Sequence, residues 1–155
     1  MEVILAKMGE MVLKGLNRRQ FEDTMLKSLR YRLRPHGDFK VYAAQSTVYI
    51  EPAAETVDMD AAFRAASRVF GVSALCRAYA CPKEMDAIFA AAAEHLAPAL
   101  RKAGTFKVES KRSDKTFPFK SPEISREIGG RLHDAFDHLR VDVNHPEVTV
   151  YVEIR

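Results

Sequence analysis

The residues of this sequence best suited to do chemistry are two clusters of basic side chains, each beside the expected start of a helix. In the first, Arg18 and Arg19 fall in the opening turn of a helix that Asn17 can cap, and Lys14 lies just upstream. An opening turn ordinarily carries acidic residues, because its unpaired N–H groups form the positive end of the helix dipole. Two arginines there oppose the dipole unless an anion is bound, so this cluster predicts a site for phosphate or another anion.

The second cluster occupies the polar segment RSDKTFPFK (112–120) and the residue before it, ahead of a second expected helix start at Ser121. Its cations are Lys111, Arg112, Lys115 and Lys120. Phe117 and Phe119 alternate with them, and aromatic rings among cations can stack on unpaired nucleobases. The alternative is that both rings are buried anchors, and it is favoured for Phe119, which lies nearer the helix.

The charge of the chain is concentrated around these clusters. Residues 7–34 hold eight basic and three acidic side chains, and residues 105–131 hold seven and four, whereas the whole chain carries only +3. Such clustering is typical of proteins that bind polyanions, since each Lys or Arg that meets a phosphate releases condensed counterions. Charge alone leaves open the alternative that these are solvated helix faces.

Other kinds of site have little support in the sequence. It contains no P-loop and no GxGxxG motif after a strand, and Cys76 and Cys81 do not form a CxxC pair. The five histidines fit no metal-ligand spacing, so we expect no metal, no catalytic residue and no cofactor in this chain. Two cysteines, no secretory signal and no apolar run of about 18 residues favour a cytoplasmic protein with no membrane span.

A β-α-β-β-α-β arrangement over residues 1–80 is expected to position the first cluster. The expected strands are 2–8, 39–43, 47–51 and 73–80, and the helices run from Asn17 to Pro35 and from Asp58 to Gly71. Apolar residues at helical spacing should face the sheet, and they are Phe21, Met25, Leu26, Leu29, Leu33, Ala62, Phe63, Ala66, Val69 and Phe70. This order of elements is that of a ferredoxin-like domain.

Residues 81–155 predict a second unit of mixed α and β structure that positions the second cluster. Its expected elements are a helix with an apolar stripe from Met85 to Leu100, kinked at Pro98 and ended by Gly104, a strand at 105–111, a helix capped by Ser121, a short strand at 141–143 and a strand at 148–154. The length of 155 residues is enough for two small domains of this kind.

Two features of the second unit indicate close neighbours. Gly129 and Gly130 weaken the helix in which they lie, which indicates that another backbone approaches closely. A packed strand is favoured over a nucleic acid as that neighbour. The last strand, if its edge is open, could pair with a second copy of the chain and form a homodimer.

Two long stretches of the sequence resemble one family. GEMVLKGLNRRQFE (9–22) resembles the N-terminal signature of tRNA uracil 4-sulfurtransferase, an enzyme of 4-thiouridine and thiamine thiazole synthesis. TFKVESKRSDKTFPFKSPEISREIGGRL (105–132), with NHPEVTVYVEI (144–154), is similar to the THUMP domain that follows in that family. The resemblance implies an α+β fold, with a ferredoxin-like domain at 1–80 and a THUMP RNA-binding domain at 81–155.

The same resemblance implies that the chain recruits the acceptor end of tRNA for 4-thiouridine formation. Both basic clusters would then bind one folded RNA. The positions that match this role are Lys14, Asn17, Arg18, Arg19, Lys111, Arg112, Lys115, Lys120, Ser121 and Arg126.

The catalytic part of the family has no counterpart in this sequence. The SGGxDS-type motif of an adenylating PP-loop domain is absent, neither Cys76 nor Cys81 matches the sulfur-carrying cysteine, and the THUMP domain is expected to lack its last strand. The chain alone should therefore be inactive, with ATP and a persulfide-donating cysteine desulfurase serving the parent enzyme. The alternatives are a standalone RNA-binding or interaction module, and an acylphosphatase-like hydrolase that would use Asn17 and Arg18.

Overall fold

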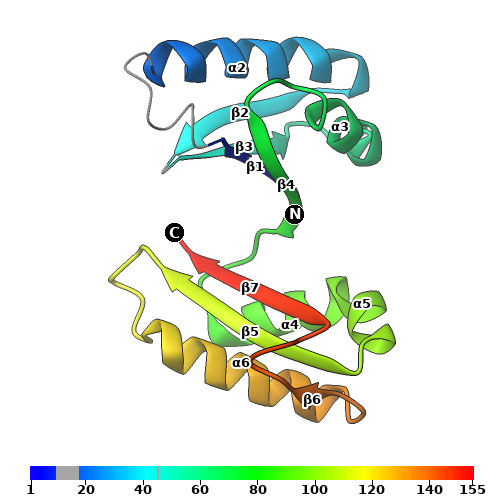
Figure 1. The fold of residues 1–155 in the computed structure, drawn as a ribbon, viewed down its shortest axis with the longest axis vertical. Coiled ribbons are helices and arrows are strands. Elements are labelled where there is room, and N and C mark those ends of the chain that lie inside the picture. Colours follow the sequence, from blue (N-terminus) through cyan, green and yellow to red (C-terminus); the bar gives the residue numbers. More distant parts are fainter. Residues whose placement is uncertain (10–17, 45) are drawn as a thin grey trace. The chain divides into compact units, whose positions relative to one another are not determined.

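The computed structural model describes residues 1–9, 18–44 and 46–155, which fold as two compact units, Met1–Ala80 and Cys81–Arg155 (Figure 1). Lys14 and Asn17 lie outside the described residues. The expected capping of the first helix by Asn17 therefore stays a prediction.

The first unit is built on an antiparallel sheet whose described strands follow the order β2-β3-β1-β4. Its elements are β1 (Glu2–Met8), α2 (Arg18–Leu33), the 3-10 turn η1 (Arg34–His36), β2 (Phe39–Ala44), β3 (Thr47–Pro52), α3 (Met59–Ala66) and β4 (Val72–Tyr79). Apart from the short 3-10 turn this is the order β-α-β-β-α-β, and the ferredoxin-like prediction is confirmed.

The core of the first unit lies between the sheet and one face of each helix. Its buried members include Ile4, Ala6, Met25, Leu29, Leu33, Val48, Ile50, Ala62 and Ala66. The helical spacing of apolar residues in α2 thus identifies the side that packs on the strands. Asp58 fixes the start of α3, because its Oδ1 accepts a hydrogen bond from the backbone N–H of Ala61 at 3.0 Å, as expected for an N-cap.

The expected burial of two aromatic residues in this unit is wrong. Phe70 is 88% exposed and Phe21 is 47% exposed. α3 ends at Ala66, four residues before Phe70, so the helical period no longer applies to that side chain. Phe21 lies on the stripe of Met25 and Leu29 but, together with Phe70, lines a shallow hollow at the beginning of α2 rather than the core.

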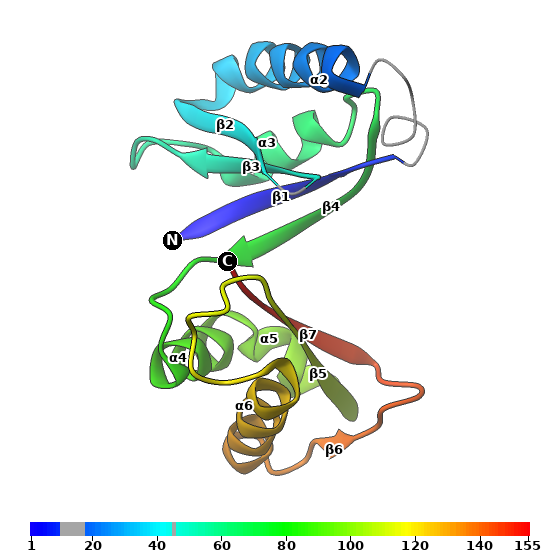
Figure 2. The ribbon, with the colours of Figure 1, turned by 90° about the vertical axis from the view of Figure 1, so that its left-hand side faces the viewer.

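The second unit contains a parallel sheet whose described strands follow the order β6-β5-β7. Its elements are α4 (Met85–His95), α5 (Ala97–Lys102), β5 (Thr105–Arg112), α6 (Ser121–Ala135), β6 (Arg140–Val141) and β7 (Val148–Ile154). Helices α4, α5 and α6 gather on one face of the sheet (Figure 2).

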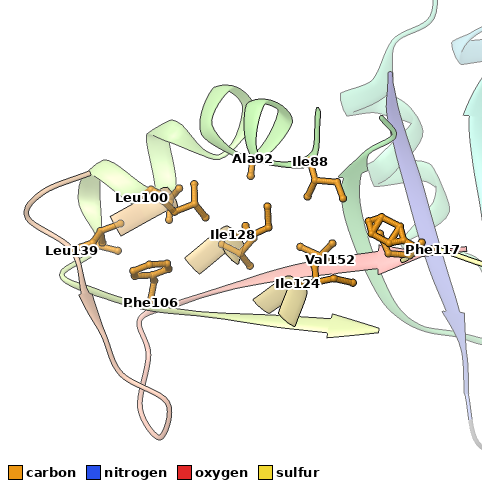
Figure 3. Close-up of a cluster of buried hydrophobic side chains, with 13 residues drawn as sticks. Ile88, Ala92, Leu100, Phe106, Phe117, Ile124, Ile128, Leu139 and Val152 are labelled. Carbon is orange, nitrogen blue, oxygen red and sulfur yellow. The ribbon is translucent and has the colours of Figure 1, made fainter. Parts of the chain in front are cut away.

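Buried apolar side chains from all three helices and two strands form the core of the second unit. Phe106, Leu100 and Leu139 lie at one end of this cluster, and Phe117 lies at the other end (Figure 3). Burying each large side chain of this kind contributes about 1.5–3 kcal/mol to stability. Phe117 therefore ties the segment between β5 and α6 to the core.

Three sequence expectations for the second unit are corrected by the structure. The single kinked helix expected ahead of Gly104 is two helices, because Pro98 stands in the first turn of α5 and cannot continue the preceding hydrogen-bond pattern. Ser121 does not cap α6. The cap is Lys120, in an extended conformation and without a side-chain hydrogen bond, and Ser121 is the first helical residue. The short strand is Arg140–Val141 rather than 141–143.

The two helical glycines do not mark a close approach of backbone among the described residues. A Cβ at Gly129 would lie 3.7 Å from Cγ2 of Val108, an ordinary contact with a side chain of β5. Outside its own stretch of helix, a Cβ at Gly130 would meet no described atom within 4 Å. The neighbour of Gly129 is thus a packed strand, as favoured from the sequence, but the contact is with the side chain of Val108 and not with the backbone of the strand.

Candidate nucleic-acid interface

In the first unit the structure places two of the expected cations at the start of α2. Arg18 is its first residue, and Arg18 Nη2 donates a hydrogen bond to Oγ of Ser46 at 2.9 Å. Ser46 lies between β2 and β3 with a φ of 65°, in the left-handed region. Arg19 is exposed, and the described first turn of α2 contains no acidic residue. The excess of positive charge expected at this helix start is present.

Not every cation on α2 remains available to a ligand. Arg30 Nη2 donates a hydrogen bond to the backbone oxygen of Val41 at 2.8 Å, so this guanidinium fastens α2 to β2. Lys27 of α2 and Arg34 of η1 are exposed. The basic face predicted from helical spacing thus combines a structural arginine with solvent-exposed cations.

In the second unit the expected cations surround the loop that joins β5 to α6, here called the β5–α6 loop (residues 113–120). Lys111, Lys115, Lys120 and Arg126 are exposed, and Ser121 is half-buried. Lys111 is the second-last residue of β5, and Arg126 lies in α6. These four exposed cations come from a strand end, a loop and a helix, and flank one short stretch of chain.

Arg112 differs from the other cations of the cluster because it is half-buried and bound within the protein. Its Nη1 donates hydrogen bonds to the backbone oxygens of Phe117, at 2.8 Å, and Phe119, at 3.3 Å. The guanidinium therefore links the end of β5 to the second half of the β5–α6 loop.

Asp114 organises the other half of this loop and was not singled out from the sequence. Its Oδ1 accepts hydrogen bonds from the N–H of Thr116, at 3.0 Å, and from the Thr116 hydroxyl, at 2.5 Å. Its Oδ2 accepts a hydrogen bond from Nζ of Lys83 at 2.7 Å. The Lys83 ammonium, and next the Thr116 donors, hold the pKa of the Asp114 carboxyl far below its usual range. An Asp two residues before a Thr is a turn signal that sequence analysis can detect.

The two phenylalanines of the loop have opposite environments. Phe117 is 5% exposed, whereas Phe119 is 41% exposed, and their ring centroids lie 5.8 Å apart with planes tilted by 57°. The expectation that Phe119 is the buried anchor is wrong. The chain bends through 117–119, so that nearness to α6 in sequence does not decide which ring enters the core.

The β5–α6 loop carries both exposed cations, which can meet an anion, and an exposed aromatic ring. Exposed lysines and arginines exchange counterions for phosphates, and an exposed ring stacks on a base of any identity. Within the described ranges no group of three or more His, Cys, Asp or Glu side chains could hold a metal ion. No helix in the described part of the chain is long and apolar enough to cross a membrane.

Comparison with known domain families defines the class of protein. Residues 3–76 match the ThiI ferredoxin-like domain and residues 82–155 match the THUMP domain. Between them the two matches cover nearly the whole sequence. The chain therefore consists of a ThiI ferredoxin-like domain followed by a THUMP domain.

Comparison with curated proteins identifies the family. The sequence is 43% identical over 155 residues to the probable tRNA sulfurtransferase of Alkaliphilus metalliredigens, and 36% identical over 156 residues to that of Acetivibrio thermocellus. The matches include 99% of this chain, but only 39% and 40% of those relatives. The chain belongs to the tRNA sulfurtransferase family and spans about two fifths of the length of these relatives.

Solved structures have the same fold. A 4-thiouridine synthetase in complex with RNA and with bound ATP matches the entire chain with a TM-score of 0.82 and 25% sequence identity, over 39% of its own length. The protein PH1313 of Pyrococcus horikoshii matches with a TM-score of 0.83 at 20% identity, over 51% of its length. The second likeness concerns the fold alone.

Proposed function

We propose that this chain is the tRNA-binding part of a tRNA sulfurtransferase, and that it recruits the acceptor end of tRNA for 4-thiouridine formation by a catalytic part outside this sequence. The observation that carries the proposal is the β5–α6 loop of the THUMP domain, where Lys115, Lys120 and the ring of Phe119 are all exposed. The elements on either side of the loop add two further exposed cations, Lys111 and Arg126. Cations supply sequence-independent affinity for phosphates, and an exposed ring adds contact with an unpaired base.

Two comparisons support the proposal. The curated relatives are named for tRNA, and the solved 4-thiouridine synthetase is a complex with RNA. In the first unit, Arg18 and Arg19 add positive charge at a helix start. We infer that both clusters bind the same tRNA.

The wider setting of the proposal follows from the family resemblance. The parent enzyme would use ATP and receive sulfur from a persulfide-donating cysteine desulfurase in the cytoplasm, and would also serve thiamine thiazole synthesis. This chain would need no cofactor to bind RNA. Because β7 is an edge strand of the described sheet, a second copy could pair with it, and sedimentation analysis at several protein concentrations tests that homodimer.

The experiment that tests the proposed function is tRNA retardation by the 155-residue chain between about 50 and 200 mM salt. We expect the logarithm of the affinity to fall linearly with the logarithm of salt concentration. Lys115→Ala/Lys120→Ala should weaken binding about 10-fold or more, a loss of about 1.4 kcal/mol or more. The magnitude of the slope should fall by about two, because two phosphate contacts are removed.

The matched control is Lys102→Ala, which removes an exposed lysine of α5 in the same unit. It should leave both the affinity and the salt slope nearly unchanged. Absence of retardation of the unmodified chain at the lowest salt would refute the proposed function and favour an interaction module. Hydrolysis of acyl phosphates that is lost in Asn17→Ala would instead support the acylphosphatase-like alternative.

A further inference from the structure

The β5–α6 loop is fastened to its own unit at three places. The backbone N–H groups of Ser113 and Asp114 both donate to the oxygen of Ile154, at 2.7 and 3.2 Å. The Asp114 carboxylate joins Lys83 to Thr116. The third fastening is Arg112, which donates to the backbone oxygens of two residues on the far side of the loop. A surface loop with this many internal bonds loses little conformational entropy when a ligand binds it.

Arg112 acts on the part of the loop that carries the two aromatic rings. The same nitrogen, Nη1, donates to the oxygens of Phe117 and Phe119, so it fixes the bend between them. The ring of Phe117 is held in the core of the second unit (Figure 3). The ring of Phe119 packs against Phe117 at a centroid distance of 5.8 Å and is 41% exposed. The ring of Phe119 thus packs on the buried ring of Phe117 and is partly exposed to solvent.

We propose that Arg112 is a positioning residue, which holds the β5–α6 loop so that Phe119 stacks on an unpaired nucleobase of the bound RNA. This inference rests on the proposed function and deepens it. In the family-based assignment Arg112 is one of several cations that contact RNA, whereas its hydrogen bonds inside the loop give it a different task. Lys115 and Lys120, which are exposed on either side of the rings in sequence, remain free to meet the flanking phosphates.

The nucleobase must be unpaired because a protein ring can reach the face of a base only where the base has left a helical stack. A single exposed ring accepts any base, since every base has an aromatic face. The proposed site therefore selects single-stranded RNA next to a duplex without reading its sequence. The chain of tRNA offers such nucleotides at its ends and in its loops.

The absence of tryptophan from the sequence allows a direct spectroscopic test. Phe119→Trp introduces a single tryptophan at the proposed stacking position. An RNA hairpin with a short single-stranded 3′ extension should quench its fluorescence at saturation, and the blunt hairpin of the same duplex should not. Phe119→Leu should weaken binding of the extended hairpin about 10-fold and leave binding of the blunt hairpin unchanged.

Variants of Arg112, each combined with Phe119→Trp, separate positioning from direct contact. Arg112→Lys keeps the positive charge but replaces the guanidinium by a flexible point charge. If Arg112 positions the loop, Arg112→Lys and Arg112→Met should both weaken binding of the extended hairpin, by about 10-fold, and both should abolish the quenching of the introduced tryptophan at saturating RNA. A direct phosphate contact would be rescued by Arg112→Lys, with quenching retained, and that result would overturn the inference.

Lys111→Ala, again combined with Phe119→Trp, is the matched control, because it removes the neighbouring exposed cation of β5. It should lower affinity and flatten the salt slope while quenching at saturation persists. Should the Arg112 variants fail to unfold cooperatively on heating, Asp114→Asn provides the second route, since it weakens the same loop through an exposed contact with Lys83. Full quenching in Asp114→Asn would also contradict the inference.

The outcomes distinguish this inference from the proposed function. A chain that retards no RNA at low salt refutes both. Suppose instead that the chain binds RNA with the expected salt dependence, but that the extended hairpin does not quench the tryptophan introduced by Phe119→Trp. That result refutes only the stacking of a nucleobase on Phe119.

Discussion

The two basic clusters look alike in the sequence but are built differently. In the first unit, Arg18 and Arg19 stand on the described first turn of α2, and Arg18 donates a hydrogen bond to Ser46 between β2 and β3. In the second unit, the cations flank a loop that Arg112 and Asp114 bind from within. At a helix start, the regular backbone fixes where the basic residues stand. In a loop, side-chain hydrogen bonds are needed to fix the backbone that carries them.

The difference shows that a charge pattern does not reveal which of its members meet the ligand. On α2 the exception is Arg30, which bonds to Val41, and in the second unit it is Arg112. Both arginines donate to backbone oxygens. A guanidinium suits this role because it carries several donors in a fixed, planar arrangement. We expect arginines of this kind to affect stability and loop geometry more than salt-dependent affinity.

The largest effect is expected for the aromatic pair of the second unit. Phe117→Ala should lower the free energy of unfolding by about 3–5 kcal/mol, because the ring is buried in the core. Phe119→Ala should cost about 1 kcal/mol or less, because the ring is partly in solvent and packs against Phe117 on one side. Urea unfolding followed by circular dichroism measures both values. Equal losses of unfolding free energy would contradict the assignment of Phe117 as the buried anchor and Phe119 as the exposed ring.

The next largest effect compares the two clusters directly. Arg18→Ala/Arg19→Ala should weaken tRNA binding by about 1–3 kcal/mol, uniformly across tRNA sequences, because the contacts are with phosphates. The thermal stability of the chain should hardly change, since Arg19 is exposed and Arg18 makes one surface hydrogen bond among the described residues. Retardation assays from about 50 to 200 mM salt measure the affinity. Unchanged binding of the double variant throughout that range would remove the first unit from the RNA interface.

A smaller effect is expected at two glycines, one in each unit, and its sign should differ. Gly37 has a φ of 129°, and a Cβ there would lie 2.7 Å from Cγ1 of Val57, so Gly37→Ala should be destabilising by more than about 1 kcal/mol. Gly130 is helical with open space around it, so Gly130→Ala should be stabilising by up to about 1 kcal/mol. Melting temperatures report both changes. A loss of tRNA affinity in Gly130→Ala would revive the idea that a nucleic-acid backbone approaches this helix.

The smallest effect concerns pH. The pKa of Asp114 is lowered in the folded chain by Lys83 and Thr116, so its contribution to stability is present above the carboxyl's unfolded pKa of about 3.9. That contribution is lost as the pH falls through and below this value. The stability difference between the unmodified chain and Asp114→Asn should therefore be constant from about pH 5 to 8 and shrink near pH 3. A difference that stays constant down to about pH 3 would show that the carboxylate is not paired in solution.

Much of the fold followed from local patterns. The strands and helices of the first unit, the cap at Asp58 and the apolar stripe of α2 were all predicted, because period-two and period-3.6 alternation report directly on which side of an element is buried. The failures at Phe21, Phe70 and Phe119 have a common cause. Each residue lies near the end of an element or in a loop, where a helical period no longer ensures that a side chain reaches the core.

The sequence by itself determined the order of the elements, the family and the places where positive charge gathers. Those properties depend on residue types and on spacings within one segment, and both can be read without tertiary information. Only the tertiary structure decided that Phe117 rather than Phe119 enters the core, that Arg112 bonds across its own loop and that Lys83 reaches Asp114. The physical reason is that burial and hydrogen bonding in a loop depend on the chain that packs beneath it, and that neighbour is supplied by elements distant in sequence.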